Sequence, residues 1–293
     1  MSRDTADRRF LAGLDWRGAA PVLGAALAFG ILFREPFTTL LRDWWNDPEA
    51  GHGLLLGPLA VVLAWRSGLL PARPQPVLGL GIIAAAVSLR YVSNLAAELY
   101  TMRMSLLFAG AGIIVFWRGL PQLTRWWLPA LLLVFSVPLP AVVLGTLAFP
   151  LQLRASQFGA MLLASRHVPV EVAGNVIHLP GQSLFVTEAC SGLRSLTALL
   201  SLGLLVGGLW LKSPVGRAAI LLAAVPVAMA LNGIRIFLTG FLVYFVDPGL
   251  GEGVMHYTEG WALFAVAFVI LGGLAWLTAR LERLVFRPRI APA

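Results

Sequence analysis

Eight apolar stretches recur along this chain, and they constrain its fold more than any other feature. They cover roughly residues 18–33, 53–65, 77–89, 104–117, 128–149, 189–211, 218–246 and 258–279. A helix needs about 20 residues to cross a bilayer, so the first four stretches must extend into their flanks or tilt little. Only 12% of the residues are charged and 58% are hydrophobic, whereas soluble domains are about 25% charged. We therefore expect an all-α polytopic membrane protein with about eight transmembrane helices.

The basic residues predict the orientation of these helices. With eight spans and a cytoplasmic N-terminus, 14 of the 22 Lys and Arg fall on cytoplasmic segments and six on outer segments, while Arg194 and Arg235 lie within spans. The acidic residues divide the other way, with four inside and ten outside. Both ends are thus predicted to be cytoplasmic (N-in, C-in). This orientation accounts for the net charge of +8 without a nucleic-acid partner.

The domain organisation is predicted to be one integral membrane domain over residues 1–293. The tails at 1–17 and 280–293 are expected in the cytoplasm, and 150–188 is expected to be the main outer segment. The first apolar stretch lacks a cleavage site of small residues, so it does not resemble a signal peptide.

Three features of the predicted membrane and outer segments follow from local pattern. Pro138 and Pro140 should kink the span at 128–149. The stretch LQLRASQFGAMLLAS, which opens the outer segment, has apolar residues at helical spacing and predicts a helix in the membrane interface. The residues around Gly174-Asn175 alternate between apolar and polar, which predicts a short β-hairpin on the outer face.

The single cysteine, Cys190, lies in TEACSGLRS (187–195), where the sixth span is predicted to begin. Thr187 is a good helix cap, so the thiol would meet the positive helix end, which favours its thiolate form. Arg194 follows four residues later on the same helical face. The alternative is a buried structural cysteine beside an arginine that reaches towards the interface.

Arg235 lies in the seventh apolar stretch, within LNGIRIFLTG (231–240). An arginine near the bilayer centre costs at least about 2.5–3.5 kcal/mol, which makes it a functional candidate, with a structural polar network as the alternative. At 1.5 Å per residue, Arg235 is about 27 Å from Arg217 and Cys190 about 33 Å from Lys212. Both are therefore expected at similar depth in the outer leaflet.

His256 falls in GEGVMHYTEGW (251–261), which is predicted to be an outer loop just before the last span. The hairpin of the last two spans would bring it over Arg235, although a loop histidine is often merely solvated. A thiolate, a cation and an imidazole on one patch suit nucleophilic acyl transfer. The four histidines are scattered along the chain, so neither a metal nor another cofactor is expected.

Other classes of membrane protein were weighed against this interpretation. A transporter or flippase would use Arg235 to bind an anionic substrate, but the inner halves of the sixth and seventh spans are nearly free of polar residues other than Ser and Thr. A lipid-linked glycosyl or phosphoryl transferase would usually pair an acidic residue with a metal. A purely structural scaffold leaves Arg235 unexplained.

The segments 187–195 and 231–236, together with His256, resemble the exosortase/archaeosortase family of membrane-embedded cysteine transpeptidases. GHGLLLGPLAVVLAW (51–65) is similar to the early His-Gly segment of that family, and VPVEVAGNVIHLPGQSLFVTEACSG (168–192) to the outer hairpin that leads into its cysteine. The family has Tyr-Ser before this His-Gly pair, whereas Ala50-Gly51 precede His52 here.

The resemblance implies Cys190 as nucleophile, Arg235 as catalytic arginine and His256 as catalytic histidine, with Arg194, Asn232 and His52 as further candidates. It implies a thiol protease of the inner membrane with its active site facing the periplasm. The implied partners are secreted proteins with a C-terminal Pro-Glu-Pro (PEP-CTERM) sorting signal, of the kind that accompanies exopolysaccharide systems, within membrane lipid. The acyl-enzyme would pass to water or to an amine or lipid acceptor.

Overall fold

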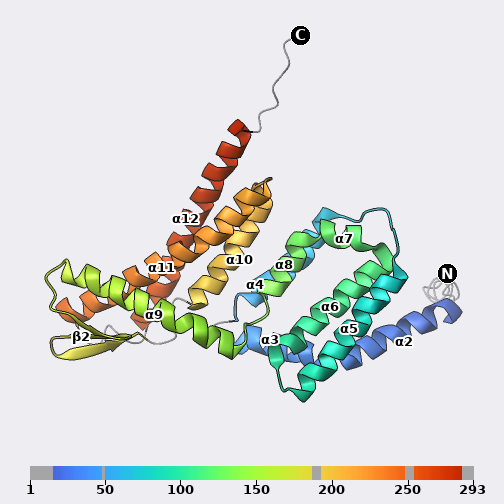
Figure 1. Cartoon of the computed structure of the whole chain (residues 1–293), viewed down its shortest axis with the longest axis horizontal. Helices are drawn as coiled ribbons and strands as arrows, with labels where there is room; N and C mark the ends of the chain where they lie inside the picture. Colours follow the sequence, from blue (N-terminus) through green and yellow to red (C-terminus); the bar gives the residue numbers. More distant parts are fainter. Residues whose placement is uncertain (1–15, 48–49, 187–192, 248–253, 286–293) are drawn as a thin grey trace, which may run out of the picture.

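The computed structural model describes residues 16–47, 50–186, 193–247 and 254–285. Within these ranges the chain forms eleven helices and three short strands (Figure 1). The helices are α2 (Trp16–Leu32), α3 (Arg34–Asn46), α4 (Gly53–Ser67), α5 (Pro76–Leu95), α6 (Leu99–Arg118), α7 (Leu120–Arg125), α8 (Trp127–Phe135), α9 (Ala141–Ala164), α10 (Leu193–Trp210), α11 (Pro214–Phe245) and α12 (Val254–Val285). The strands are β1 (Glu171–Ala173), β2 (Val176–Leu179) and β3 (Gln182–Phe185).

The helices α5 and α6 form a close antiparallel pair in the first half of the chain (Figure 1). A short turn joins them, in which Ala97 adopts a φ of 52°. Two glycines let the backbones approach. A Cβ on Gly79 would lie 2.5 Å from the Cα of Phe116, and one on Gly112 would lie 2.7 Å from a side-chain carbon of Ile83. Small residues at such positions are typical of membrane helix pairs, which associate by close packing.

The remaining helices of the first half pack around this pair. Helices α2 and α3 meet at a bend of 54°, where the ring of Phe33 is buried against Ala86 of α5 and Ala109 of α6. Leu56 of α4 and Leu132 of α8 belong to a cluster that also contains Leu204 of α10. This cluster joins the two halves of the chain.

The second half is built on α10, α11 and α12. Leu199 of α10 packs with Ala224 and Ala228 of α11 and with Leu271 of α12. Helix α11 has 32 residues, which gives it a length of about 48 Å. It therefore reaches beyond α10 and offers a second surface near its C-terminal end.

Helix α9 and the small sheet cover that second surface of α11 (Figure 1). The core there contains Leu163 of α9, Ile177 of β2 and Ile236 of α11. Gly233 allows α9 to cross closely, because a Cβ at that position would lie 2.1 Å from a ring carbon of Phe158. The crossing places the middle of α9 beside the turn of α11 that carries Arg235.

The sheet contains one strand more than the predicted hairpin. Its order is β1-β2-β3, with antiparallel pairing throughout. Gly174, at a φ of 64°, lies in the first turn, and Gly181, at a φ of 88°, lies in the second. Both conformations favour glycine, since residues with a Cβ rarely adopt a positive φ. The position of the sheet on the outer face stays a prediction.

Four helical segments are long and apolar enough to cross a membrane, and a fifth arises if α2 and α3 count as one bent span. The four are Pro76–Leu95, Leu99–Arg118, Pro214–Phe245 and Ala262–Leu284. Shorter apolar helices occur at Gly53–Ser67 and Leu196–Trp210. The described residues thus agree with a polytopic membrane protein, while the count of eight spans and the N-in, C-in topology stay predictions.

The prediction of a single kinked helix over residues 128–149 is wrong. Helix α8 ends at Phe135, and a new helix begins at Ala141 and runs to Ala164, at a steep angle to α8 (Figure 1). Pro138 and Pro140 lie in the break, and a proline removes a helical hydrogen bond and clashes with the preceding turn. Two prolines so close together end the helix, and the predicted interfacial helix continues directly from the new start as part of α9.

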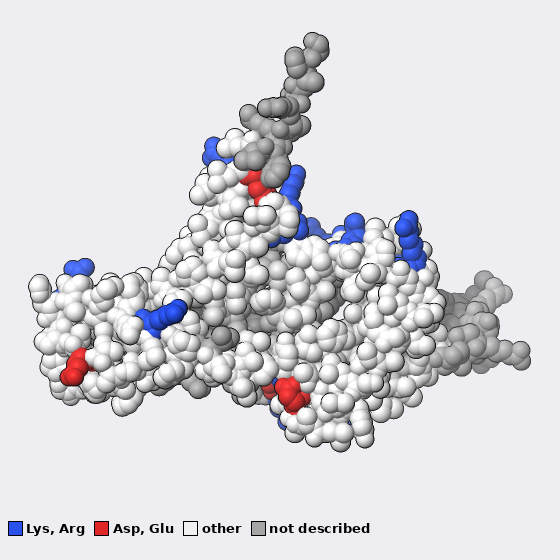
Figure 2. Space-filling model, viewed as in Figure 1, with Lys and Arg blue, Asp and Glu red and all other residues white. Residues whose placement is uncertain are grey.

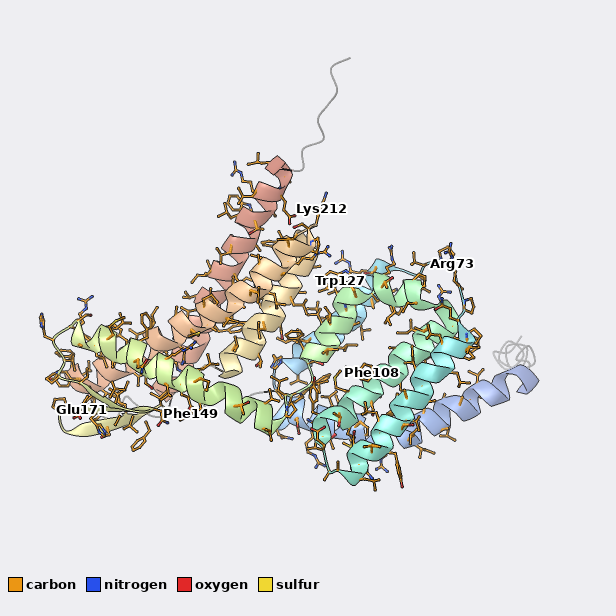
Figure 3. The ribbon with its side chains drawn as sticks, in the orientation of Figure 1. Arg73, Phe108, Trp127, Phe149, Glu171 and Lys212 are labelled. Atoms are coloured by element: carbon orange, nitrogen blue, oxygen red, sulfur yellow. The ribbon has the colours of Figure 1, made fainter. Side chains whose placement is uncertain are left out.

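Basic residues gather along one edge of the molecule (Figure 2). Figure 3 places Arg73 and Lys212 there, on two different connections, together with Trp127 at the start of α8. The guanidinium of Arg118 donates to the Leu70 carbonyl over 3.0 Å, and that of Arg217 lies 4.6 Å from the centre of the Trp127 ring. The described connections between α4 and α5, between α6 and α8 and between α10 and α11, which are predicted to be cytoplasmic, therefore lie on one side of the molecule.

We expect the glycine at position 79 to be required for the pairing of α5 and α6. Gly79→Ala should destabilise the protein by about 1–3 kcal/mol, because an added Cβ must push the backbones apart. Thermal unfolding in detergent micelles, followed by loss of the monodisperse species, measures the effect.

Gly81→Ala is the matched control, since a Cβ there meets nothing within 4 Å. This variant should unfold at the wild-type temperature or above it. A Gly79→Ala protein as stable as Gly81→Ala would show that the two helices do not pack as described.

Candidate functional site

The residues predicted from the sequence fall mainly on three adjacent helices. Arg194 belongs to α10, Asn232 and Arg235 to α11, and His256 to α12. His256 was predicted to lie in a loop, and that prediction is wrong, because α12 begins at Val254. The helix starts before the apolar stretch, and its first two turns contain His256, Thr258 and Glu259, which lower the apolar content there. Cys190 lies outside the described residues, three positions before the start of α10.

Arg235 and Asn232 face the interior between these three helices. They are one turn apart on α11, and Asn232 is only 5% exposed while Arg235 is half-buried. Both line a small cavity of about 20 Å³, together with Leu199 of α10 and with Leu263 and Phe264 of α12. The arginine therefore lies where α10, α11 and α12 converge, in mostly apolar surroundings.

A second and much larger cavity lies on the other side of α10. Its volume is about 650 Å³, and Thr197 and Leu200 of α10 form one wall. The other walls come from the end of α3, the residue before α4, the start of α6 and the break between α8 and α9. The residues that complete the lining are Asp43, Asp47, His52, Ala97, Glu98, Leu99, Tyr100, Arg103, Val134, Phe135, Val137, Pro138, Leu139, Pro140 and Val142.

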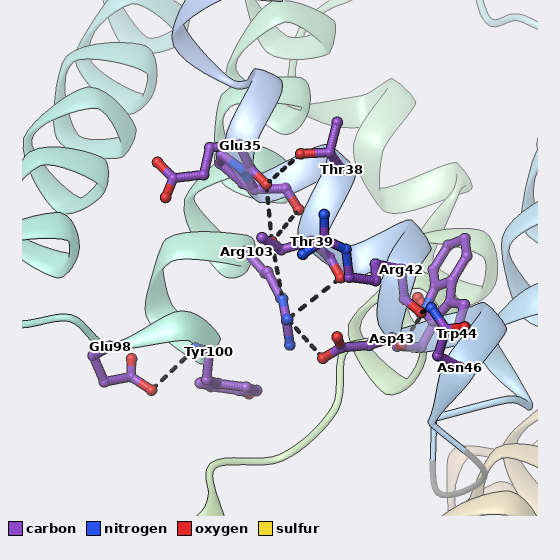
Figure 4. A network of polar contacts seen from close by, with 12 residues as sticks. Glu35, Thr38, Thr39, Arg42, Asp43, Trp44, Asn46, Glu98, Tyr100 and Arg103 are labelled. Carbon is purple, nitrogen blue, oxygen red and sulfur yellow. Dashed lines mark hydrogen bonds and ion pairs between the residues drawn. The ribbon is translucent and has the colours of Figure 1, made fainter.

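An ion pair of α3 and α6 supports this larger cavity (Figure 4). The Nη2 atom of Arg103 lies 2.7 Å from an Oδ2 of Asp43. The arginine is only 3% exposed, so the pair is shielded from water on the arginine side. Breaking a buried pair by removing one partner leaves an uncompensated charge. The pair therefore holds α3 against α6 and fixes the acidic side of the cavity.

Glu98 is the N-cap of α6. Its carboxylate accepts hydrogen bonds from the backbone N–H groups of Tyr100 and Thr101 and from the hydroxyl of Thr101. Burial raises the pKa of Glu98, but these hydrogen bonds and the charge of Arg103 outweigh it and bring the pKa below its usual value. The cavity thus contains a carboxylate that stays ionised at neutral pH.

His52 is positioned by the end of α8. Its Nε2 lies 3.1 Å from the carbonyl oxygen of Phe135. A carbonyl oxygen only accepts, so Nε2 carries the hydrogen, and Nδ1 is then the basic nitrogen of the neutral ring. The neighbouring Trp44 donates its indole N–H to the Ser136 carbonyl over 2.7 Å. Both side chains therefore satisfy carbonyl groups at the helix end.

Packing explains why a glycine follows His52. A Cβ on Gly53 would lie 2.1 Å from the indole nitrogen of Trp44, and one on Gly57 would lie 2.8 Å from the same ring. The ring lies flat against this glycine face of α4. The His-Gly pair that was noted in the sequence is therefore explained by the packing of Trp44 as well as by the position of His52.

The acidic and basic residues of the larger cavity were not predicted from the sequence. The sequence predicts only that these residues lie on outer segments of the chain. They are Asp43, Asp47, Glu98 and Arg103. The sequence feature that could have pointed to them is the concentration of polar residues in two outer connections. No periodicity in the sequence, however, indicates that these two connections lie close together. Among the described residues, no group of three or more His, Cys, Asp or Glu side chains is arranged to hold a metal ion.

Comparison with known proteins gives a family. No curated protein and no solved structure matches the chain. The model of a family described as transmembrane exosortase (Exosortase_EpsH) matches residues 44–273. That range includes the residues that line the larger cavity except Asp43, the whole of α10 and α11, most of α12, and every candidate residue from His52 to His256. The chain therefore belongs to the transmembrane exosortase family.

Proposed function

We propose that this protein is a cysteine transpeptidase that cleaves the C-terminal sorting signal of secreted proteins through an acyl-enzyme on Cys190. The signal would be of the Pro-Glu-Pro type, and cleavage would occur at the periplasmic face of the inner membrane. Family membership implies a sorting transpeptidase in general. The observation that carries the residue assignments is the convergence of α10, α11 and α12 around Arg235.

Helical register supports a common site for the three residues. Leu199 lines the cavity of Arg235, and α10 begins six residues before it, about 9 Å along the axis. Cys190 precedes that start by three residues, which span at most about 11 Å. His256 comes seven residues before Leu263, so helical periodicity assigns both to one face of α12.

The proposed chemistry begins when the thiolate of Cys190 attacks the scissile carbonyl carbon. A C–S bond forms, and Arg235 stabilises the negative charge on the tetrahedral oxygen. The peptide C–N bond then breaks, and His256 gives its proton to the leaving amine. A second nucleophile attacks the thioester, the C–S bond breaks and the thiolate returns. The lipid-facing bundle would let the transmembrane helix of the substrate approach from the side.

The surroundings of Arg235 argue against a transporter. Among the described residues, the others that line its cavity, apart from Asn232, are Leu199, Ala228, Leu231, Leu263, Phe264 and Ala267. A transported anion needs a continuing series of polar groups, because charge is costly in an apolar medium. A single site for developing negative charge has no such requirement.

Topology is the first test. We expect both termini in the cytoplasm, because the basic connections lie along one edge of the molecule (Figure 2). A reporter fused to the C-terminus should be active only in the form that works in the cytoplasm. Activity of a periplasmic reporter at that position would contradict the orientation.

The thiol is the second test. Cys190 is the only cysteine, so one thiol-specific reagent addresses one residue. Cys190→Ala and Cys190→Ser should abolish processing of a sorting-signal substrate, while the protein remains in the membrane. A maleimide should inactivate the wild type. Near-normal processing by both variants would require a different nucleophile.

The third test separates catalysis by Arg235 from a structural role. Removing a donor to a developing oxyanion costs about 100- to 1,000-fold in rate. We expect Arg235→Ala to lose activity on this scale, and Arg235→Lys to retain little, since lysine lacks the planar fork. Processing rate and protein abundance are measured in the same membranes.

Arg154→Ala is the matched control, because Arg154 of α9 is exposed. It removes the same charge from a surface and should leave the specific rate unchanged. If Arg235→Ala lowers abundance while the remaining protein processes substrate at the normal specific rate, Arg235 is structural.

A further inference from the structure

The cations at the basic edge of the molecule form no ion pair within the part of the chain that the structure describes (Figure 2). The two ion pairs of the described residues both belong to α3, where Glu35 pairs with Arg90 and Asp43 with Arg103. The described cations on segments predicted to be cytoplasmic take part in neither pair. They are Arg66, Arg73, Arg118, Arg125, Lys212, Arg217, Arg280 and Arg283. An anionic partner would therefore meet positive charge that these residues do not already share with a carboxylate.

Exposed tryptophans accompany these cations. Trp65, Trp117 and Trp210 lie in the last turns of α4, α6 and α10, and each is more than half exposed. An arginine or a lysine follows each of them within two residues. Tryptophans gather at the level of the lipid headgroups, because the ring has an apolar body and a polar N–H group. The basic edge is therefore expected to lie among headgroups, so the anion that it meets belongs to a lipid.

The two halves of the chain meet at this edge, between the start of α8 and the end of α10. A Cβ on Gly208 of α10 would lie 2.6 Å from a methyl carbon of Leu128, so the two helices touch there. The preceding residue, Trp127, has the guanidinium of Arg217 at 4.6 Å from its ring centre. Because Arg217 belongs to α11, this contact brings cations from two separate connections to one junction.

Three cations lie at this junction, and they keep donors available. Arg217 donates its Nε–H to the Leu211 carbonyl over 3.0 Å, and Arg125 donates its Nε–H to the Ser67 carbonyl over 2.6 Å. These bonds hold both guanidinium groups in place, whereas their terminal nitrogens have no acceptor among the described residues. The exposed ammonium group of Lys212 has none there either. Forked N–H donors of this kind match the oxygen atoms of a phosphate.

A carboxylate beside the junction does not neutralise these cations. Glu282 of α12 accepts hydrogen bonds from the hydroxyl of Ser213 and from the backbone N–H groups of Lys212 and Ser213. These donors are neutral, so the bonds order the connection between α10 and α11 without forming an ion pair. Three cations against one carboxylate leave the described junction with a formal charge of +2. The charge therefore favours an anionic ligand.

We propose that this junction binds the phosphate of an anionic phospholipid, with Arg125, Lys212 and Arg217 as its cationic ligands. Basic sites between transmembrane helices on the cytoplasmic side suit anionic headgroups. The phosphate bridges the first half of the chain, through Arg125, to the second half, through Lys212 and Arg217. Because the bridge exists only in the folded protein, the lipid stabilises that state. This inference is independent of Cys190 and of the cleavage reaction.

Lipid competition tests the site. Full-length protein in dodecyl maltoside micelles is given equal amounts of dioleoyl phosphatidylglycerol and dioleoyl phosphatidylcholine, which share their acyl chains and differ in net charge. Native mass spectrometry then gives the ratio of the two bound lipids. We expect phosphatidylglycerol to be preferred by about tenfold, and to raise the unfolding temperature more than phosphatidylcholine does.

Lys212→Gln is the informative variant, since its ammonium group makes no hydrogen bond among the described residues. Its preference for phosphatidylglycerol should fall by about fivefold, the scale expected for one basic residue near anionic lipid. Arg217→Lys keeps the charge but loses the planar fork, so its preference should fall as well. The lipid ratio is internal to each sample, so a lower yield of folded protein does not affect it.

Arg73→Gln is the matched control. It removes an exposed cation from the same edge, at a position that Figure 3 places away from Trp127 and Lys212. This variant should keep the wild-type lipid ratio. An equal loss in Arg73→Gln and Lys212→Gln would overturn the site at the junction in favour of a diffuse basic surface.

Two further results would overturn the proposal. Equal retention of both lipids by the wild type would show that charge does not select the ligand. Inorganic phosphate, added to micelles without phospholipid at constant ionic strength, separates a free anion from a lipid headgroup. We expect it to leave the unfolding temperature unchanged, and a rise as large as that with phosphatidylglycerol would assign the site to a soluble anion.

Discussion

The break between α8 and α9 is the constraint on which the candidate site depends. The last carbonyl groups of a helix have no partner within it, and the prolines that follow α8 supply no N–H groups. Trp44 and His52 donate to the carbonyls of Ser136 and Phe135. The helix end thus holds the connection between α3 and α4 in place, and the same break forms one wall of the larger cavity.

The sequence predicts the helices better than it predicts their connections. Hydropathy locates the apolar core of α5 and α6, and the expected extension into the flanks is confirmed for these two helices, which have 20 residues each. Helix α4 has only 15 residues, so the extension is not found there. Hydropathy fails at 128–149, because it averages over two prolines that change the direction of the chain. It also places His256 in a loop, because polar residues in the first two turns of a helix resemble a connection when only apolar content is counted.

The charges follow a similar pattern. The division of basic and acidic residues along the sequence could be predicted, but their pairing across distant connections could not. Arg90 pairs with Glu35 and Arg103 with Asp43, at sequence separations of 55 and 60 residues. Such pairs follow from the packing of α3 beside the α5–α6 pair. Arg235 was identifiable because a charge within an apolar stretch needs a reason that local sequence does not provide.

Helix α10 separates two environments of opposite electrostatic character. On one side Arg235 shares a small cavity with Asn232 and with apolar side chains of α10, α11 and α12, where a cation acts strongly on a developing negative charge because little solvent screens it. On the other side the carboxylates of the larger cavity attract positive charge. In the proposed reaction, α10 would separate the cation that stabilises the oxyanion from the carboxylates of the larger cavity.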